Sequence, residues 1–77
     1  MVIQVRLHDG LIRYAPSSAT GVLAVDVHDD ITITNLLEEL EIEQAEIYLI
    51  KVNGSKNNKD CRLYDGDHVE FYPAMTV

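Results

Sequence analysis

Residues 32–42 read TITNLLEELEI, and this segment decides the fold because it is the one clear amphipathic helix of the chain. Its apolar side chains recur at positions i, i+3, i+4 and i+7, which places them on one face of a helix. That stripe consists of Ile33, Leu36, Leu37 and Leu40. Thr32 stands at the N-cap position, where its hydroxyl accepts a hydrogen bond from the amide of Thr34 or Asn35. We therefore predict a helix from near Thr32 to Leu40–Ile42.

Four segments around this helix have the composition of β-strands. They are residues 2–8, 22–27, 47–52 and 68–72, which are rich in β-branched residues and mostly alternate between apolar and polar side chains. Residues 11–14 are expected to extend the first strand into a hairpin after a turn at Asp9-Gly10. The segment 47–52 is almost entirely apolar, which is typical of a central strand covered on both faces. The predicted order is strand, strand, helix, strand, strand.

Two tight turns connect the later strands. Asn53-Gly54 is the strongest hairpin signal of the chain, and such a turn needs a positive φ at one or both residues. The run Tyr64-Asp65-Gly66-Asp67 forms a second turn directly before the last strand.

A single helix cannot bury its apolar stripe alone, so it has to lie across one face of a sheet. With the order above, this predicts an α+β fold of the ubiquitin-like β-grasp type, in which a mixed sheet of four or five strands carries the helix. This topology requires the first and last strands to pair in parallel at the centre of the sheet. The predicted core consists of Ile3, Val5, Leu23, Val25, Leu36, Leu37, Leu40, Leu49, Val69 and Phe71.

The length of 77 residues predicts one domain that spans residues 1–77. A domain of this size buries only about 60% of the surface of its unfolded chain, so its core has little to spare. The one cysteine, Cys61, excludes an internal disulfide. No run of about 18 apolar residues is present, and the first residues do not resemble a signal peptide, so we expect a cytoplasmic protein without a membrane span.

The charge of the chain is strongly negative and unevenly distributed. A formal net charge of −7 argues against nucleic-acid binding, which needs a basic face, and permits a basic protein partner. Residues 26–46 contain eight acidic residues and no Lys or Arg, whereas residues 51–62 contain four of the six basic residues. We therefore expect an acidic helix side, a basic loop after the Asn53-Gly54 turn, and a monomer in the absence of a partner.

No catalytic or metal-binding pattern stands out. His8, His28 and His68 each lie near acidic residues, but they belong to different strands or turns and are expected to be solvated rather than to share a metal. Cys61 is expected to be a small, half-buried residue. Recognisable spacing for a catalytic triad and a phosphate-binding glycine loop are both lacking, so we predict neither an enzyme nor a cofactor.

Three stretches of the chain occur in the order and spacing of a known family. They are the helix segment 32–40, the hairpin Val52-Asn53-Gly54, and the run from Leu63 through Asp65-Gly66-Asp67 to Tyr72-Pro73. In all three, the chain resembles the ubiquitin-like sulfur carriers, namely the small subunit of molybdopterin synthase and the sulfur carrier of thiamine biosynthesis. The last stretch is the most specific of the three.

The resemblance implies a chemistry at the C-terminus. In that family the chain ends in Gly-Gly, a ubiquitin-activating-type enzyme adenylates the terminal carboxylate, and a thiocarboxylate then donates sulfur. Residues without a Cβ suit this role because the tail enters a narrow site in extended form. Here Val77 stands where the first glycine would be, and the second is missing. Either the sequence is a trimmed form, or this member has lost the conjugation chemistry.

The resemblance also implies where partners bind. The partners would be an adenylating enzyme or a synthase large subunit, contacted by the tail and the exposed face of the last strand. The predicted contacts are Tyr72, Pro73, Ala74, Met75, Thr76 and Val77. An apolar tail suits a groove or strand addition, and the alternative is a tail that folds back on its own sheet. Two functions stay open: a sulfur-carrier-like protein, and a non-catalytic β-grasp interaction module without carrier chemistry.

Overall fold

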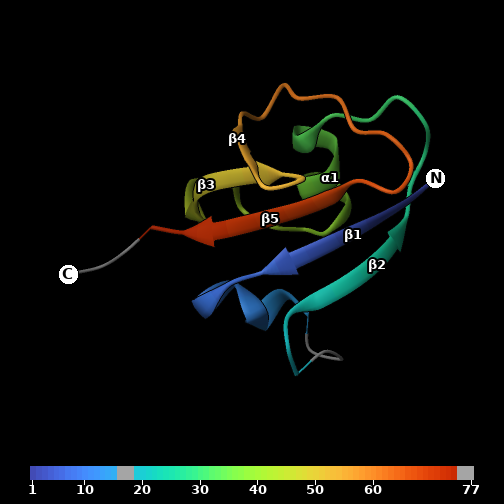
Figure 1. The fold of residues 1–77 in the computed structure, drawn as a ribbon. Helices are drawn as coiled ribbons and strands as arrows, with labels where there is room; N and C mark the ends of the chain where they lie inside the picture. The colour runs from blue at the N-terminus through green and yellow to red at the C-terminus, as the bar shows by residue number, and fades with distance from the viewer. Residues whose placement is uncertain (16–18, 75–77) are drawn as a thin grey trace.

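The computed structural model describes residues 1–15 and 19–74. Within these residues the chain forms five strands, one α-helix and two short 3-10 helices (Figure 1). In chain order they are β1 (Val2–Leu7), η1 (Asp9–Tyr14), β2 (Val22–Asp26), α1 (Ile33–Glu39), η2 (Gln44–Glu46), β3 (Ile47–Val52), β4 (Ser55–Asn57) and β5 (His68–Pro73). None of the helices in this described part is long and apolar enough to cross a bilayer.

The five strands form one mixed sheet in the order β2-β1-β5-β3-β4. β1 pairs in parallel with β5, with Val5 opposite Val69, and the other neighbours are antiparallel. Figure 1 shows α1 behind this sheet, so that one face is covered and the other is open. The β-grasp prediction and the central parallel pair are both confirmed.

The helix begins where its cap was predicted. The Thr32 hydroxyl accepts a hydrogen bond from the Asn35 amide at 3.3 Å, and the Asn35 side chain in turn accepts one from the Thr32 amide at 3.1 Å. This reciprocal pair satisfies two of the amides that a helix N-terminus leaves without intrahelical partners. The C-cap is Leu40, and the Ile42 amide donates to the carbonyl of Leu37 at 2.9 Å.

The core lies between α1 and the inner face of the sheet, and most of its predicted members are there. Its fully buried large side chains are Phe71, Ile3, Leu7, Leu11, Ile33, Leu36, Leu37, Leu63, Val5 and Val69. Leu23, Val25 and Leu40 are only half-buried and pack against this cluster. Leu49 is half-buried and lies outside the core, so its assignment was wrong.

The error at Leu49 arises from the position and irregularity of β3. This strand lies next to the edge strand β4, and only its inner face is covered by the core. The side chains on that inner face, Ile50 and Val52, are buried. A register shift between Ile47 and Leu49 changes which side chains point inward, and Tyr48 is 76% exposed. The prediction of a strand covered on both faces was therefore wrong.

Residues 11–14 form part of the 3-10 helix η1, so the predicted hairpin extension was also wrong. Asp9 takes a positive φ of 52°, and the Leu11 amide then donates to the carbonyl of His8 at 3.1 Å. This turn directs the Leu11 side chain into the core, where it is fully buried, and Ala15 follows it. The burial of these apolar groups at the end of β1 favours the helical turn over an exposed strand.

The hairpin at Asn53-Gly54 is confirmed. Both residues have positive φ values, 52° and 84°, which is the geometry of a type I′ turn. The turn joins β3 to β4, with Val52 opposite Ser55.

Candidate docking face

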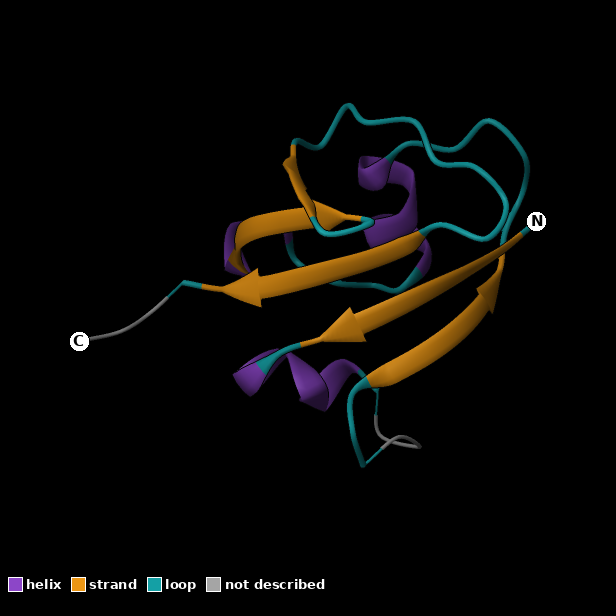
Figure 2. Cartoon of the chain, in the orientation of Figure 1, coloured by secondary structure: helices purple, strands orange, loops and turns teal. Residues whose placement is uncertain are grey.

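The open face of the sheet is centred on β5. Along this strand Val69 and Phe71 are buried against the helix side, while His68, Glu70 and Tyr72 point the other way. Figure 2 shows β5 and β1 running across the front of the molecule with α1 behind them. We call the outward side chains of β5 and of its neighbours β1 and β3 the outer face.

Tyr72 is an aromatic side chain of the outer face that neighbouring side chains hold in place. Its ring stacks on the imidazole of His8, with 4.1 Å between the ring centroids and an angle of 6° between the planes. The Lys51 ammonium lies 5.4 Å from the centre of the same ring, within range of a cation–π attraction. The ring is therefore held in one orientation at the place where β5 ends.

The carboxylate of Glu70 links His8 to Tyr72 by hydrogen bonds. One oxygen of Glu70 forms hydrogen bonds with Nε2 of His8 at 2.8 Å and with the Tyr72 hydroxyl at 3.0 Å. The hydrogen bond from His8, supported by Tyr72 and Lys51 and opposed by partial burial, lowers the pKa of the Glu70 carboxyl. Desolvation and the hydrogen bond to Glu70 raise the pKa of the Tyr72 hydroxyl, because both disfavour a phenolate.

Basic groups flank this cluster on the outer face. The register places Arg6 of β1 and Lys51 of β3 on either side of Glu70, and Lys56 of β4 opposite Lys51. Paired residues of neighbouring strands project from the same face of a sheet, so these cations share the open side. The open side of the sheet thus carries three cations around the Glu70 carboxylate, a grouping that the sequence did not predict.

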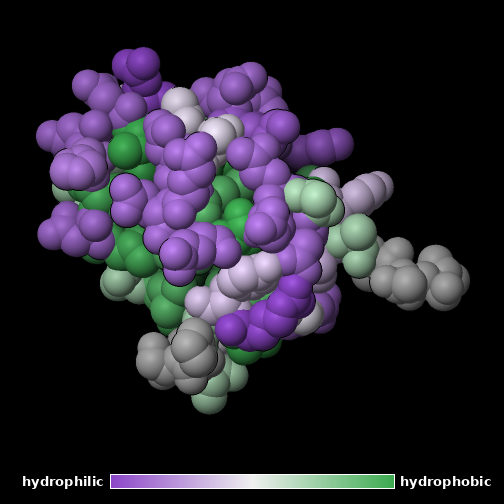
Figure 3. Space-filling view, turned by 180° about the vertical axis from the view of Figure 1, so that it is seen from behind, coloured by the Kyte–Doolittle hydropathy of each residue, from purple (hydrophilic) through white to green (hydrophobic). Residues whose placement is uncertain are grey.

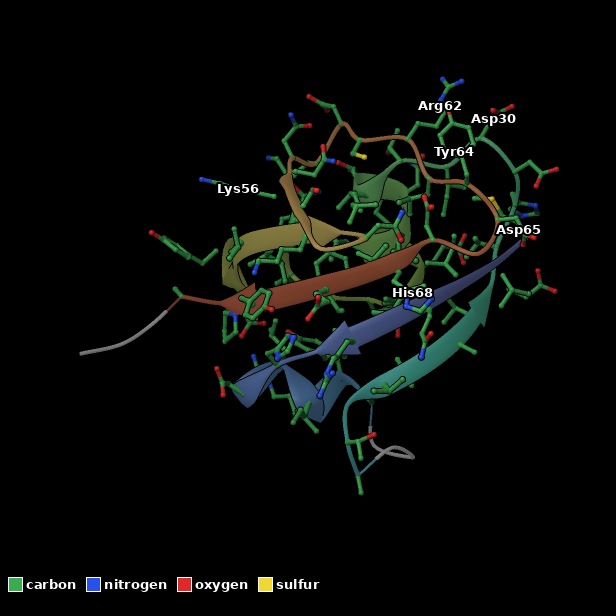
Figure 4. All side chains as sticks on the ribbon, viewed as in Figure 1. Asp30, Lys56, Arg62, Tyr64, Asp65 and His68 are labelled. Carbon is green, nitrogen blue, oxygen red and sulfur yellow. The ribbon has the colours of Figure 1, made fainter. Side chains whose placement is uncertain are left out.

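The Asp65-Gly66 turn fixes the start of β5 against β1. A carboxylate oxygen of Asp65 accepts from the Val2 amide at 2.7 Å, and the Gly66 amide donates to the carbonyl of Val2 at 2.8 Å. Gly66 has a φ of 85°, a conformation that residues with a Cβ rarely adopt. Figure 4 shows Asp65 at the end of the molecule where β5 begins, and His68 over the open face of the sheet.

Asp67 ties the same turn to the β3–β4 hairpin. Its carboxylate accepts from the Asn53 side chain at 3.0 Å and from the Tyr64 amide at 2.9 Å. The Asn53 side-chain oxygen accepts from the His68 amide at 2.9 Å. The two turn motifs that carried the family resemblance therefore bind each other, and their role in this fold is to position β5.

Three of the six predicted contact residues lie within the described structure. Tyr72 is half-buried on the outer face, Pro73 is half-buried opposite Ile47, and Ala74 is exposed beyond the strand. The predicted contacts Met75, Thr76 and Val77 lie outside the described residues. Of these three residues, Tyr72 lies on the outer face, and Pro73 and Ala74 follow it where β5 ends, beside η1 and η2.

Sequence reasoning missed a polar cluster beside the end of β5. Arg13 and Tyr14 of η1 both bind the carboxylate of Glu46 in η2. These two short helices and the Pro73–Ala74 segment border a cavity of about 560 Å³. The sequence held no signal for this cluster, because residues 13 and 46 meet only through η1, which was expected to be a strand.

The histidines and the cysteine form no metal site among residues 1–15 and 19–74. His28 and His68 are exposed, as expected. His8 differs from the expected solvated residue, because it is half-buried in its contacts with Tyr72 and Glu70. Cys61 is half-buried against the core, as predicted.

Solved structures of three bacterial and archaeal proteins share this fold. A putative molybdopterin converting factor subunit 1 from Pyrococcus furiosus is 20% identical with a TM-score of 0.74, covering 97% of this chain and 99% of that one. Subunit 1 in the complex of subunits 1 and 2 of the molybdopterin-converting factor from Helicobacter pylori is 19% identical with a TM-score of 0.62, covering 100% and 99%. A thiamine biosynthesis protein from Geobacter metallireducens is 24% identical with a TM-score of 0.59, covering 96% and 97%.

TM-scores of 0.59 to 0.74 over nearly the whole chain establish a common ubiquitin-like fold. A search of curated protein sequences found no significant match. The whole chain, residues 1–77, matches the family described as Mut7-C ubiquitin. The protein therefore belongs to the Mut7-C ubiquitin family, a group with the ubiquitin-like fold that the sequence predicted.

Proposed function

We propose that this domain is a ubiquitin-like protein of the sulfur-carrier type that docks on an adenylating enzyme or a synthase large subunit. Docking uses the outer face around Tyr72 together with the tail from Pro73 to Val77. In this role the domain carries sulfur on its modified C-terminus and is not itself a catalyst. The observation that supports the proposal most is the fixed Tyr72 ring at the point where the central strand β5 passes into the tail.

The composition of this surface suits protein binding. Tyr72 offers an aromatic contact and Pro73 an apolar one, the Lys51 ammonium lies 5.4 Å from the centre of the Tyr72 ring, and Arg6 lies opposite the neighbouring Glu70. Aromatic residues that present a rigid apolar body and a polar tip carry a large share of binding energy at interfaces. Because His8 and Glu70 already hold the Tyr72 ring, docking loses little side-chain entropy at this residue.

The choice of partner rests on similar proteins. The Helicobacter pylori structure is a complex of subunits 1 and 2 of a molybdopterin-converting factor, and this chain is similar to its subunit 1 in fold. By analogy, the partner of this domain is a large subunit of that kind or the enzyme that adenylates such carriers. A fold-level analogy of this sort assigns a class of partner rather than one protein.

A second candidate function is an interaction module that docks without carrier chemistry. The residue type at position 77 favours it, because Val77 is β-branched at the position that corresponds to the first glycine of the sulfur carriers. A β-branched residue restricts the backbone and crowds its own carboxylate. This candidate keeps the outer face and gives up the reactive terminus.

Adenylate formation separates the two functions. We would compare a chain made to end at Val77 with a variant that ends Thr76-Gly-Gly, using the adenylating enzymes of the molybdopterin and thiamine pathways and measuring AMP transfer. The proposal predicts that the Gly-Gly variant is adenylated and that the Val77 chain binds the same enzyme but reacts poorly. Equal adenylation of both chains would show that Val77 does not impair the chemistry. If neither chain binds such an enzyme, the docking proposal is wrong.

A further inference from the structure

The edge of the sheet at β2, over Ala24 to Asp26, is a second surface, on the side opposite β4. β2 pairs with β1 alone among the described strands. The Val27 amide donates to the carbonyl of Met1 at 2.9 Å, and Val25 lies opposite Ile3. In an antiparallel pair, alternate residues bond to the neighbouring strand. Ala24 and Asp26 therefore direct their backbone N–H and C=O groups away from β1.

An apolar groove runs beside this edge, between β2 and α1. Val25 and Val27 point to the helix side but are only half-buried, and so is Leu40 at the end of α1. With Leu36 they line a cavity of about 340 Å³. Figure 3, which views the molecule from the side opposite Figure 1, shows green apolar atoms visible between the purple polar ones. This part of the core is therefore accessible from the β2 edge.

The helix wall of the groove is acidic. Glu39 of α1 lines it, Asp26 lies at its β2 edge with its side chain exposed, and the whole segment 26–46 contains eight acidic residues and no Lys or Arg. Four of these charges are partly balanced. The Met1 ammonium lies 3.5 Å from Asp26 and 3.8 Å from Asp29, Arg62 lies 3.4 Å from Asp30, and Arg13 pairs with Glu46. The carboxylates that remain give the groove a negative potential.

We propose that the groove between β2 and α1 binds an extended basic segment of a partner protein by strand addition. The partner's backbone pairs with Ala24 and Asp26, an apolar side chain enters the cavity at Val25 and Leu40, and flanking Lys or Arg side chains meet the carboxylates. Backbone pairing at a sheet edge supplies affinity, and alternate side chains supply specificity. At about 3.3 Å per residue, the stretch from Ala24 to Val27 accommodates about four residues of such a strand.

A second copy of this chain fits the groove poorly. Edge-to-edge pairing of two β2 strands would bring two acidic segments together, in molecules that each carry a formal net charge of −7. Like charges placed opposite each other destabilise a strand pair. The charges therefore favour a basic segment of another protein as the occupant. This segment can bind while the outer face is engaged, because the groove and the outer face lie on opposite sides of the sheet.

The test uses the acetylated peptide Lys-Val-Lys-Val-Lys-Val-Lys as a probe, titrated into the isotope-labelled chain and followed by amide NMR. We expect shifts of Ala24, Asp26 and Leu40, with none around Tyr72, and we expect no binding of the same peptide with Glu in place of Lys. The proposal is overturned if the shifts map to the outer face, or if the Glu peptide binds equally well. It is also overturned if the β2 edge shifts with protein concentration alone, which would indicate a second copy.

Two variants with matched controls test the contacts. Ala24→Pro removes an outward N–H at an edge position that tolerates proline, whereas Ala24→Ser keeps that N–H. Glu39→Lys reverses a charge on the groove, whereas Glu38→Lys makes the same change in net charge beside it. We expect Ala24→Pro and Glu39→Lys each to weaken peptide binding about tenfold, with the controls close to the unchanged chain. Equal binding by Glu39→Lys and Glu38→Lys would overturn the proposal even if Ala24→Pro fails to fold.

Discussion

At the scale of single residues, the open face depends on one carboxylate. Glu70 joins His8 of the first strand to Tyr72 of the last, and its pKa lies below the ordinary 4.5 because the His8 hydrogen bond favours the ionised form. A carboxyl whose pKa is lower in the folded state stabilises the fold when it is ionised. This contribution is present above about pH 4.5 and is lost as the pH falls through the lower folded pKa.

Glu70→Gln therefore has a pH-dependent effect on stability. We expect the variant to melt at a lower temperature than the unchanged chain at pH 7, because glutamine cannot supply the ionised acceptor. The difference should be smaller at pH 3, because Glu70 gains its proton as the pH falls through its lowered pKa. Thermal unfolding at both pH values measures it. A difference of equal size at the two pH values would mean that the charge of Glu70 contributes nothing to the fold.

At the scale of elements, the hairpin between β3 and β4 tests how far a turn depends on glycine. Gly54 has a φ of 84° with open space around it, whereas Gly10 has an ordinary φ and also has room for a side chain. Gly54→Ala should cost about 1–2 kcal/mol of unfolding free energy, because a residue with a Cβ is strained in the left-handed region. Gly10→Ala is the matched control and should cost much less. Denaturant unfolding measures both, and equal losses would count against the turn geometry.

The helix gives a second prediction at this scale. Leu37 lies in the buried stripe of α1 with 1% of its surface exposed, so Leu37→Ala should cost about 2–5 kcal/mol. The cause is the lost burial together with the cavity that remains. Leu40→Ala is the matched control, because Leu40 is only half-buried, and its loss should be smaller. A loss under about 1 kcal/mol for Leu37→Ala would show that the buried face of the helix is assigned wrongly.

The elements differ in how well the sequence predicted them. The helix and the hairpin were predictable because their signals are local: the Thr32 cap, the 3.6-residue stripe and the Asn53-Gly54 dipeptide. The 3-10 helix at Leu11 was not predictable from local signals. It is stabilised by the burial of Leu11 in a core that exists only in the assembled fold. The outward position of Leu49 follows from a register shift and an uncovered sheet face, which alternation of residue types does not reveal.

At the scale of the whole molecule, the candidate site was half predictable. Tyr72, Pro73 and Ala74 follow from the resemblance and from the last strand. The groups that hold Tyr72 come from elsewhere, since His8 and Lys51 belong to β1 and β3. His8 meets Tyr72 through the parallel pairing of β1 with β5, and Lys51 meets it through the antiparallel pairing of β3 with β5. The sequence predicted which strands pair at the centre of the sheet, but it did not predict the register that brings these three side chains together.

The central claim is that the outer face around Tyr72 binds the partner, and one comparison tests it directly. Binding of the chain to a synthase large subunit or adenylating enzyme would be measured by calorimetry for Tyr72→Ala and for Tyr64→Ala. Tyr64 is 66% exposed and lies at the opposite end of β5, so its removal is a matched control. We predict that Tyr72→Ala weakens binding about tenfold or more, and that Tyr64→Ala leaves it nearly unchanged. Equal affinities of the two variants would contradict the proposed docking face.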